Sequence, residues 1–225
     1  MQGGSVELLD VFGDDLTVVN AARVSFGKES TELVDRDKKL IKYLAAHGHN
    51  SPFFHPIARF RIKMPIFVAR EWFRHTVGFA RNEVSRRYVD DPPECYIPSE
   101  ENIRERDSNK KQGSKDDSIK DAKLARSFIQ EETNRSMLAY RALLDLGVAP
   151  EVARIILPQS MYTEFIETAS IAAYARLCTL RLDPHAQKEI REYAAEVSKL
   201  LEAKFPVSWL ALQPQPSASE STSSA

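Results

Sequence analysis

The segment 58–64 constrains the fold more than any other part of the chain. Its residues alternate strictly, with Ala58, Phe60, Ile62 and Met64 on one side and three basic residues on the other. Alternation of this kind is typical of a β-strand that buries one face and exposes the other. Such half-buried strands belong mostly to antiparallel sheets. We therefore expect an α/β fold of the α+β type, a mostly antiparallel sheet flanked by helices.

Three further segments are expected to be strands: residues 6–11, 82–88 and 161–170. The last fits a helix almost as well, but its β-branched and aromatic residues favour a strand. A first helix is expected to start at a cap on Asp15 or Thr17 and to end near residues 25–27. Further helices are expected at about 37–48, 66–76, 117–146, 150–158, 171–181 and 183–205, the last capped by Asp183.

The chain is expected to form a single domain over residues 1–212. Its 225 residues are 43% hydrophobic and 28% charged, which is ordinary for one globular domain with its own core. Residues 99–118 mix polar and charged side chains without an apolar period, and we interpret them as a mobile loop beside the site. Residues 213–225 are rich in Pro and Ser and are expected to be a disordered tail.

Charge and composition exclude several classes of function. The formal net charge of −1 provides no overall field for nucleic acid or for an anionic membrane. The chain has neither a basic-then-apolar leader nor an apolar run of about eighteen residues, so we expect a cytoplasmic protein. Cys95 and Cys178 match neither a disulfide framework nor a zinc spacing, and we interpret both as buried thiols.

Covalent catalysis by the chain's own side chains is not indicated. Ser25, Ser51 and Ser85 lack the GxSxG elbow, and neither cysteine has a histidine beside it in sequence. No GxGxxG or GxxxxGK[ST] loop is present among the eight glycines, so a Gly-rich turn does not bind nucleotide phosphates.

Four histidines raise the question of a metal site: His47, His49, His55 and His75. Their spacing matches none of the strong zinc signatures, and we expect no metal. His49 also lies in a loop suited to stacking on a flat ring. A metal-dependent hydrolase that uses His47, His49 and His55 is kept as a minor hypothesis.

Residues 70–88 carry five arginines, two carboxylates and one histidine, a combination suited to a planar anionic ligand. Arginine stays charged when buried and binds phosphate through a planar fork of donors. In a helix over 66–76, Arg70 and Arg74 would lie one turn apart. In a strand over 82–88, Ser85 and Arg87 would face the same way. Arg154 stands among apolar neighbours, which indicates burial.

Residues 74–88 read RHTVGFARNEVSRRY, and other characteristic segments lie at 21–26, 47–49, 65–70, 151–154 and 180–187. Together they resemble the flavin-dependent thymidylate synthases, whose signature is RHRxxSxNExSxRY. The resemblance covers residues 6 to about 206.

The resemblance implies reductive methylation of dUMP to dTMP without a protein nucleophile. Methylenetetrahydrofolate would donate the carbon, and NADPH would supply the reducing equivalents through tightly bound FAD. It also implies a homotetramer whose active sites lie where subunits meet, with neither nucleic acid nor membrane as a partner.

The resemblance also implies the site residues. The dUMP site would comprise Arg70, Glu71, Arg74, Glu83, Ser85, Arg86, Arg87, Arg154 and Arg181. Arg181 would be the catalytic residue, because it would stabilise negative charge that develops on the uracil ring. The FAD site would comprise His49, Ser51, Arg74, His75, Thr76, Glu83, Ser170, Ala172 and Arg176.

Several positions depart from the family pattern. Thr76 replaces an arginine and Ala80 a serine, and one extra residue lies before Asn82, where Arg81 could restore the lost charge. Glu71 stands where glutamine is common. Ser170 and Arg176 stand where asparagines are frequent. These departures motivate a second hypothesis, a nucleotide- or RNA-binding protein that keeps the fold without the chemistry.

Overall fold

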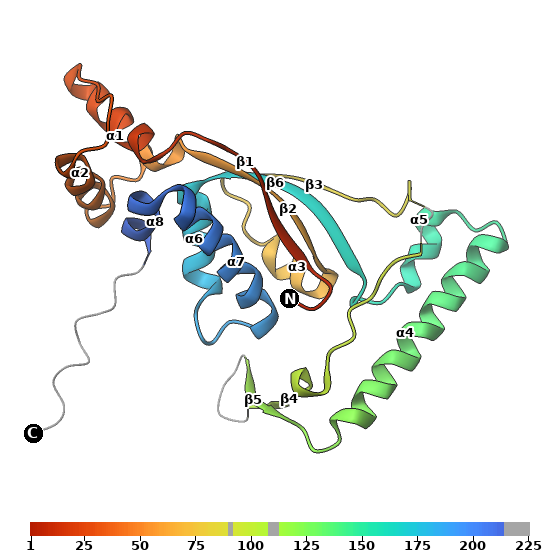
Figure 1. Ribbon diagram of the computed structural model, residues 1–225. Coiled ribbons are helices and arrows are strands. Elements are labelled where there is room, and N and C mark those ends of the chain that lie inside the picture. The colour runs from red at the N-terminus through yellow and green to blue at the C-terminus, as the bar shows by residue number, and fades with distance from the viewer. Residues whose placement is uncertain (90–91, 108–112, 214–225) are drawn as a thin grey trace, which may run out of the picture.

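The computed structural model describes residues 1–89, 92–107 and 113–213. A four-stranded antiparallel sheet crosses the molecule in the order β1-β2-β6-β3 (Figure 1). The strands are β1 (Ser5–Phe12), β2 (Ile57–Pro65), β6 (Tyr162–Ser170) and β3 (Phe79–Glu83). The predicted fold class is therefore confirmed, and so is the strand interpretation of residues 161–170.

Helices lie at one face and at both ends of this sheet (Figure 1). The α-helices are α1 (Asp15–Arg23), α2 (Asp35–Ala46), α3 (Ile66–Trp72), α4 (Ala122–Asp145), α5 (Pro150–Ala153), α6 (Ile171–Arg181), α7 (Lys188–Lys204) and α8 (Pro206–Leu212). Short 3₁₀ helices are η1 (Val24–Phe26), η2 (Ser51–Phe54), η3 (Glu100–Asn102) and η4 (Arg154–Ile156). None of the helices in the described ranges is long and apolar enough to cross a bilayer.

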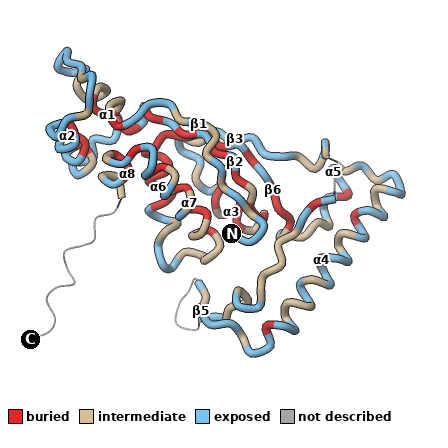
Figure 2. The backbone as a smooth tube through the Cα atoms, viewed as in Figure 1, coloured by how far each residue is buried: buried red, intermediate tan, exposed pale blue. Residues whose placement is uncertain are grey.

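The core lies between the sheet and helices α3, α6 and α7, where Figure 2 shows most of the buried chain. Strand β2 turns its four apolar residues, from Ala58 to Met64, into this core and leaves Arg59 and Arg61 exposed on the other face. Helix α6 begins and ends where it was predicted, and it is buried over most of its length. Cys178 on α6 is buried as predicted, whereas Cys95 is only half-buried.

Two predicted elements around the signature are wrong in length. Helix α3 stops at Trp72, because Arg74 and His75 donate their N–H groups three residues back, to Glu71 and Trp72, in tight turns. Arg74 therefore lies outside the helix, and it does not stand one helical turn from Arg70 as predicted. Strand β3 stops at Glu83, where the chain leaves β6 and turns, with the Tyr88 N–H donating to the Ser85 carbonyl at 3.0 Å.

The segment predicted as a mobile loop, residues 99–118, contains ordered structure. It holds η3 and a hairpin of β4 (Arg104–Arg106) and β5 (Ser114–Ser118), although residues 108–112 lie outside the described ranges. Arg104 pairs with Glu189 of α7 at 2.8 Å, and Lys188 donates to Asn102 at 2.9 Å. These long-range contacts hold the hairpin, which has no apolar pattern that the sequence could reveal.

The helix boundaries at other places also differ from expectation. Asp14, rather than Asp15 or Thr17, caps α1, while Asp15 is buried and accepts from the N–H groups at the start of α8. Helix α4 begins only at Ala122 because β5 occupies the preceding residues. Asp183 accepts from the His185 N–H and caps no helix, so α7 begins at Lys188.

Helix α8 was not predicted. The predicted tail lies outside the described residues except for Gln213.

A buried carboxylate connects the elements beneath the signature. Glu167 on β6 is fully buried and accepts from the Trp72 indole at 3.2 Å. It also forms an ion pair with Arg81 of β3, whose guanidinium lies 4.7 Å from the centre of the Phe79 ring. Burial raises the pKa of Glu167, and the charge of Arg81 opposes that rise. Arg81 therefore serves this pair and does not replace the signature arginine missing at Thr76.

We expect Glu167→Ala to lower the free energy of unfolding by about 3–5 kcal/mol, because it leaves a largely buried guanidinium without its partner. The matched control is Glu164→Ala, an exposed carboxylate on the same strand, which should cost less than about 0.5 kcal/mol. Urea denaturation followed by circular dichroism measures both. Equal losses in the two variants would contradict a central role for the buried pair.

Candidate functional site

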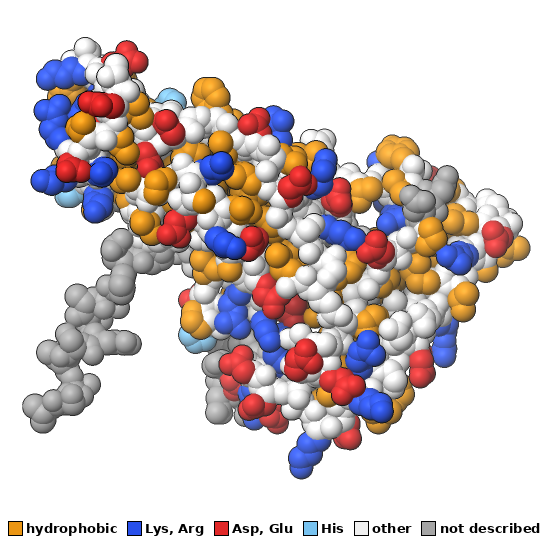
Figure 3. Space-filling model, viewed as in Figure 1, with side chains coloured by type: hydrophobic (Ala, Val, Ile, Leu, Met, Phe, Trp, Pro, Cys, Tyr) orange, Lys and Arg blue, Asp and Glu red, His pale blue; other side chains and the backbone are white. Residues whose placement is uncertain are grey.

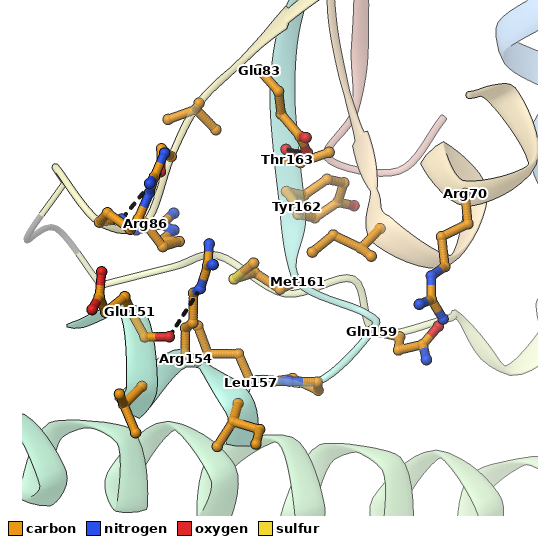
Figure 4. A pocket seen from close by; sticks show the side chains of 17 residues that line it. Arg70, Glu83, Arg86, Glu151, Arg154, Leu157, Gln159, Met161, Tyr162 and Thr163 are labelled. Carbon is orange, nitrogen blue, oxygen red and sulfur yellow. Dashed lines mark hydrogen bonds between the residues drawn. The ribbon is translucent and has the colours of Figure 1, made fainter. Parts of the chain in front are cut away.

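A cavity of about 800 Å³ opens between the end of β3, the start of β6, helix α3 and the α5–η4 segment (Figure 4). Its charged lining consists of Arg70, Glu83, Arg86, Arg87, Glu151 and Arg154. Apolar side chains such as Leu157 and Met161 complete the wall. Four arginines outnumber two glutamates, so the cavity favours an anion.

The four arginines reach this cavity from three local structures: α3, the turn after β3 and η4. Arg70 extends from the exposed side of α3, while Arg86 and Arg154 lie on the opposite side of the cavity (Figure 4). Arg87 lies in the turn after β3 and donates from Nε to the Ser85 hydroxyl at 3.1 Å. Arg154 begins η4 and donates to the Glu151 carbonyl at 3.3 Å. It is exposed, contrary to expectation, as are its apolar neighbours Val152 and Ile155, while the buried residue of this segment is Ala153 at the end of α5.

Glu83 has a partner that the sequence did not indicate. The hydroxyl of Thr163, a buried residue of β6, donates to the Glu83 carboxylate at 2.5 Å (Figure 4). The two residues are eighty positions apart, and only the pairing of β3 with β6 brings them together. Thr163 thus orients a carboxylate at the wall of the cavity.

Arg181 forms a separate cluster at the end of α6. Its Nε donates to Nε2 of His75 at 2.8 Å, and its terminal nitrogens bind the Glu71 carboxylate and, at 3.4 Å, the Glu71 carbonyl. Arg181 and Glu71 line a second cavity of about 930 Å³, whose far wall includes Arg104 and Ser114 of the hairpin.

The predicted dUMP residues therefore divide between two cavities of the single chain. Six of them line the first: Arg70, Glu83, Ser85, Arg86, Arg87 and Arg154. Glu71 and Arg181 line the second. Arg74 is exposed in the turn after α3, and neither cavity includes it.

His75 is held in its neutral form. Burial and, next in size, the positive charge of Arg181 lower the pKa of His75 to about 4. Because Nε2 accepts a hydrogen bond from Arg181, the proton of the neutral ring is on Nδ1.

Three of the predicted flavin residues, Ser170, Ala172 and Arg176, lie at the start of α6 and in its first turns. Ala172 and Arg176 line a third cavity of about 650 Å³ together with Asn50. Arg176 donates to the Val77 carbonyl at 2.9 Å and so fixes the loop that carries Arg74, His75 and Thr76 beside α6. Ser170 caps α6, since its hydroxyl accepts from the Ala173 N–H at 3.3 Å. His49 and Ser51 are exposed near the end of α2 and in η2.

These residues fit a flavin dinucleotide. The third cavity has a wall of small side chains, from Ala45, Ala46, Ala172, Ala175 and Ala211, which suits a flat ring system. The exposed guanidinium groups of Arg74 and Arg176 suit a diphosphate. In the described parts of the chain, no three His, Cys, Asp or Glu side chains are placed to hold a metal ion. His47 instead stacks on Tyr43 with ring centres 4.0 Å apart.

Comparison with known proteins decides the family. The family described as thymidylate synthase complementing protein matches residues 7–207. A flavin-dependent thymidylate synthase of Kosmotoga olearia is 44% identical over 212 residues, 93% of this chain and 90% of the relative. The chain belongs to the flavin-dependent thymidylate synthase family. A further relative from Thermus thermophilus is 41% identical over 210 residues, 93% of this chain and 76% of that protein.

A solved structure supports the same assignment. The UMP/dUMP methylase PolB from Streptomyces cacaoi, bound with 5-Br dUMP, aligns with a TM-score of 0.83 and 32% identity. The alignment covers 92% of this chain and 94% of that chain. The family assignment from the signature is therefore confirmed, and the departures at Glu71, Thr76 and Ala80 occur within a true member of the family.

We predict that His75 titrates near pH 4 and that Arg181→Ala raises this midpoint towards the ordinary value of about 6.5. The rise should be incomplete, because burial remains. An unfolded chain binds the same proton at a higher pH, so His75 destabilises the fold as the pH falls from about 6.5 towards 4. Carbon-detected NMR titration of the five histidines measures the midpoint. A midpoint near 6.5 in the unsubstituted protein would refute the arrangement.

Proposed function

We propose that this chain catalyses the reductive methylation of dUMP to dTMP. Methylenetetrahydrofolate would be the carbon donor and NADPH the reductant, through bound FAD. The observation that carries the proposal is the cavity with four arginines, in a chain whose relatives are flavin-dependent thymidylate synthases. We further propose that residues 1–212 form the functional domain and that it works in the cytoplasm.

The first cavity suits the phosphate and ribose of the nucleotide. A phosphate dianion needs two positive charges and several donors, and Arg70, Arg86, Arg87 and Arg154 can supply both. The hydroxyl of Ser85 supports Arg87, and Thr163 holds the Glu83 carboxylate, which can accept from a ribose hydroxyl.

Arg181 would act at the base. Its guanidinium is fixed by His75 and Glu71, and a fixed cation stabilises negative charge on a ring without having to reorganise during the reaction. Bound FAD would supply the hydride. His49, Ser51, Arg74, His75, Thr76, Glu83, Ser170, Ala172 and Arg176 would hold and orient it. Neither cysteine takes part, in agreement with the raised pKa that burial gives the Cys178 thiol.

The division of the nucleotide residues between two cavities supports a site shared by subunits. Helix α4 and the residue at its C-cap also expose large apolar side chains, with Phe128 59%, Leu138 68% and Leu146 80% exposed. Some hydrophobic side chains at the end of the molecule formed by α4 and α5 are visible in Figure 3. Apolar surface of this extent favours burial against another chain. We propose a homotetramer in which the arginine cavity of one subunit meets Arg181 of another.

Arg154→Ala is expected to raise the Kd for dUMP about 10- to 100-fold, because a charged hydrogen-bonding partner of the phosphate is lost. Arg181→Ala should lower kcat by about 100-fold or more. Isothermal titration and steady-state turnover measure the two effects. Arg36→Ala, an exposed arginine on α2, is the matched control and should change neither. Unchanged Kd and kcat in the first two variants would overturn the assignment of these residues.

The absorbance spectrum distinguishes an enzyme from a binding protein that has lost its chemistry. Purified protein should be yellow, and NADPH should bleach the flavin band, which oxygen should restore. UMP is assayed beside dUMP, because the solved relative is described as a UMP/dUMP methylase. Methylation of UMP alone, or protein without flavin absorbance after addition of FAD, would refute the proposal.

Leu138→Glu is expected to reduce the mass of the assembly, because it places a charge on the exposed apolar side of α4. Light scattering after size exclusion measures that mass. Leu138→Met keeps the surface apolar and should leave it unchanged. A monomeric unsubstituted protein would refute the homotetramer.

A further inference from the structure

Arg181 is the last residue of α6, and nearly all of its side chain is covered, with 18% exposed. Glu71 in the last turn of α3 and His75 just after that helix receive three of its hydrogen bonds. His75 accepts from Nε at 2.8 Å, the Glu71 carboxylate from Nη1 and the Glu71 carbonyl from Nη2 at 3.4 Å. The orientation of the guanidinium is thus set by one short segment of chain.

Glu71 lines a different cavity from the four arginines that suit a phosphate, although it follows Arg70 directly in the chain. It lines the cavity of Arg181 and is absent from the lining of the first cavity. A carboxylate among phosphate-binding arginines would repel the ligand. A carboxylate paired with Arg181 instead balances the positive charge of the guanidinium. The geometry therefore separates Glu71 from phosphate binding, although the resemblance assigned it to the nucleotide.

Arg181 keeps some of its N–H donors free of contacts with the described residues of the chain, and a ligand can use them. A guanidinium has five N–H groups, and three of those on Arg181 are used by His75 and Glu71. Two remain, one on each terminal nitrogen, and Arg181 lines the cavity. A planar ligand with carbonyl oxygens at its edge can accept from this remaining pair.

We propose that Glu71 is a positioning residue that holds Arg181, through an ion pair, in the orientation required at the pyrimidine base. This inference rests on the proposed function of Arg181. The side chain at this position is a carboxylate, so the contact with Arg181 is an ion pair and not only a hydrogen bond of the kind that an amide would form. Glu71 acts through Arg181 and not by binding the phosphate.

The test is a double-mutant cycle in the full-length, FAD-loaded protein. Glu71→Ala should lower kcat about 10- to 100-fold and leave KM for dUMP within about threefold, because it disturbs Arg181 and spares the phosphate site. Glu71→Gln keeps an acceptor oxygen and should retain more activity than Glu71→Ala. The variant with Glu71→Ala and Arg181→Ala should be no slower than Arg181→Ala alone. Glu202→Ala, an exposed carboxylate on α7, is the control.

Losses that multiply in the double variant, or a change confined to KM, would overturn the proposal, since Glu71 would then act independently of Arg181. A second readout does not depend on turnover. Freed from Glu71, Arg181 should lose contact with His75, so Glu71→Ala should raise the NMR titration midpoint of His75, whereas Glu71→Gln should raise it less. An unchanged midpoint in Glu71→Ala would contradict the positioning role. If the unsubstituted protein fails to methylate dUMP, the proposed function falls, and the midpoint still tests the contact between Glu71 and Arg181.

Discussion

The structure around the site depends on one buried carboxylate, Glu167. A charge without exposure to water needs partners, and here a tryptophan from the end of α3 and an arginine from β3 provide them. The two partners stand on either side of the loop 73–78, so Glu167 fixes both ends of the segment that presents Arg74, His75 and Thr76. The ring of Phe73, 4.9 Å from that of Phe165, secures the same loop from within the core. The loop of the signature is thus held in place by buried polar contacts beneath it.

Much of this arrangement could be predicted, and the limits have physical reasons. The strand of 58–64 was found because one-sided burial imprints a period on the sequence. The hairpin of β4 and β5 was missed because an ion pair from Arg104 to α7 and a hydrogen bond between α7 and the adjacent η3, rather than an apolar face, hold it in place. Arg154 was expected to be buried because its neighbours are apolar, but Val152 and Ile155 are themselves exposed, so apolar neighbours in sequence did not indicate burial here.

Contacts between residues far apart in the chain could not be predicted from the sequence. Arg181 is 106 positions from His75, and Thr163 is eighty from Glu83. Arg81 looked available to a cofactor because it falls in the signature, yet the pairing of β3 with β6 directs it to Glu167. The family resemblance supplied the site residues, but the geometry divides them into an arginine group with excess positive charge and a neutralised Arg181. In the proposed function, that division separates recognition of the phosphate from recognition of the pyrimidine ring.

The hairpin that faces Arg181 gives this site a further property. Arg104, with only 9% of its side chain exposed, binds both Ser114 and Glu189, so the wall of the second cavity is attached to α7 in the free chain. Ordering a loose segment during association consumes conformational entropy that would otherwise strengthen binding. A ligand that enters beside Arg181 meets β4 and β5 already ordered, and its affinity is not reduced by the need to fold them.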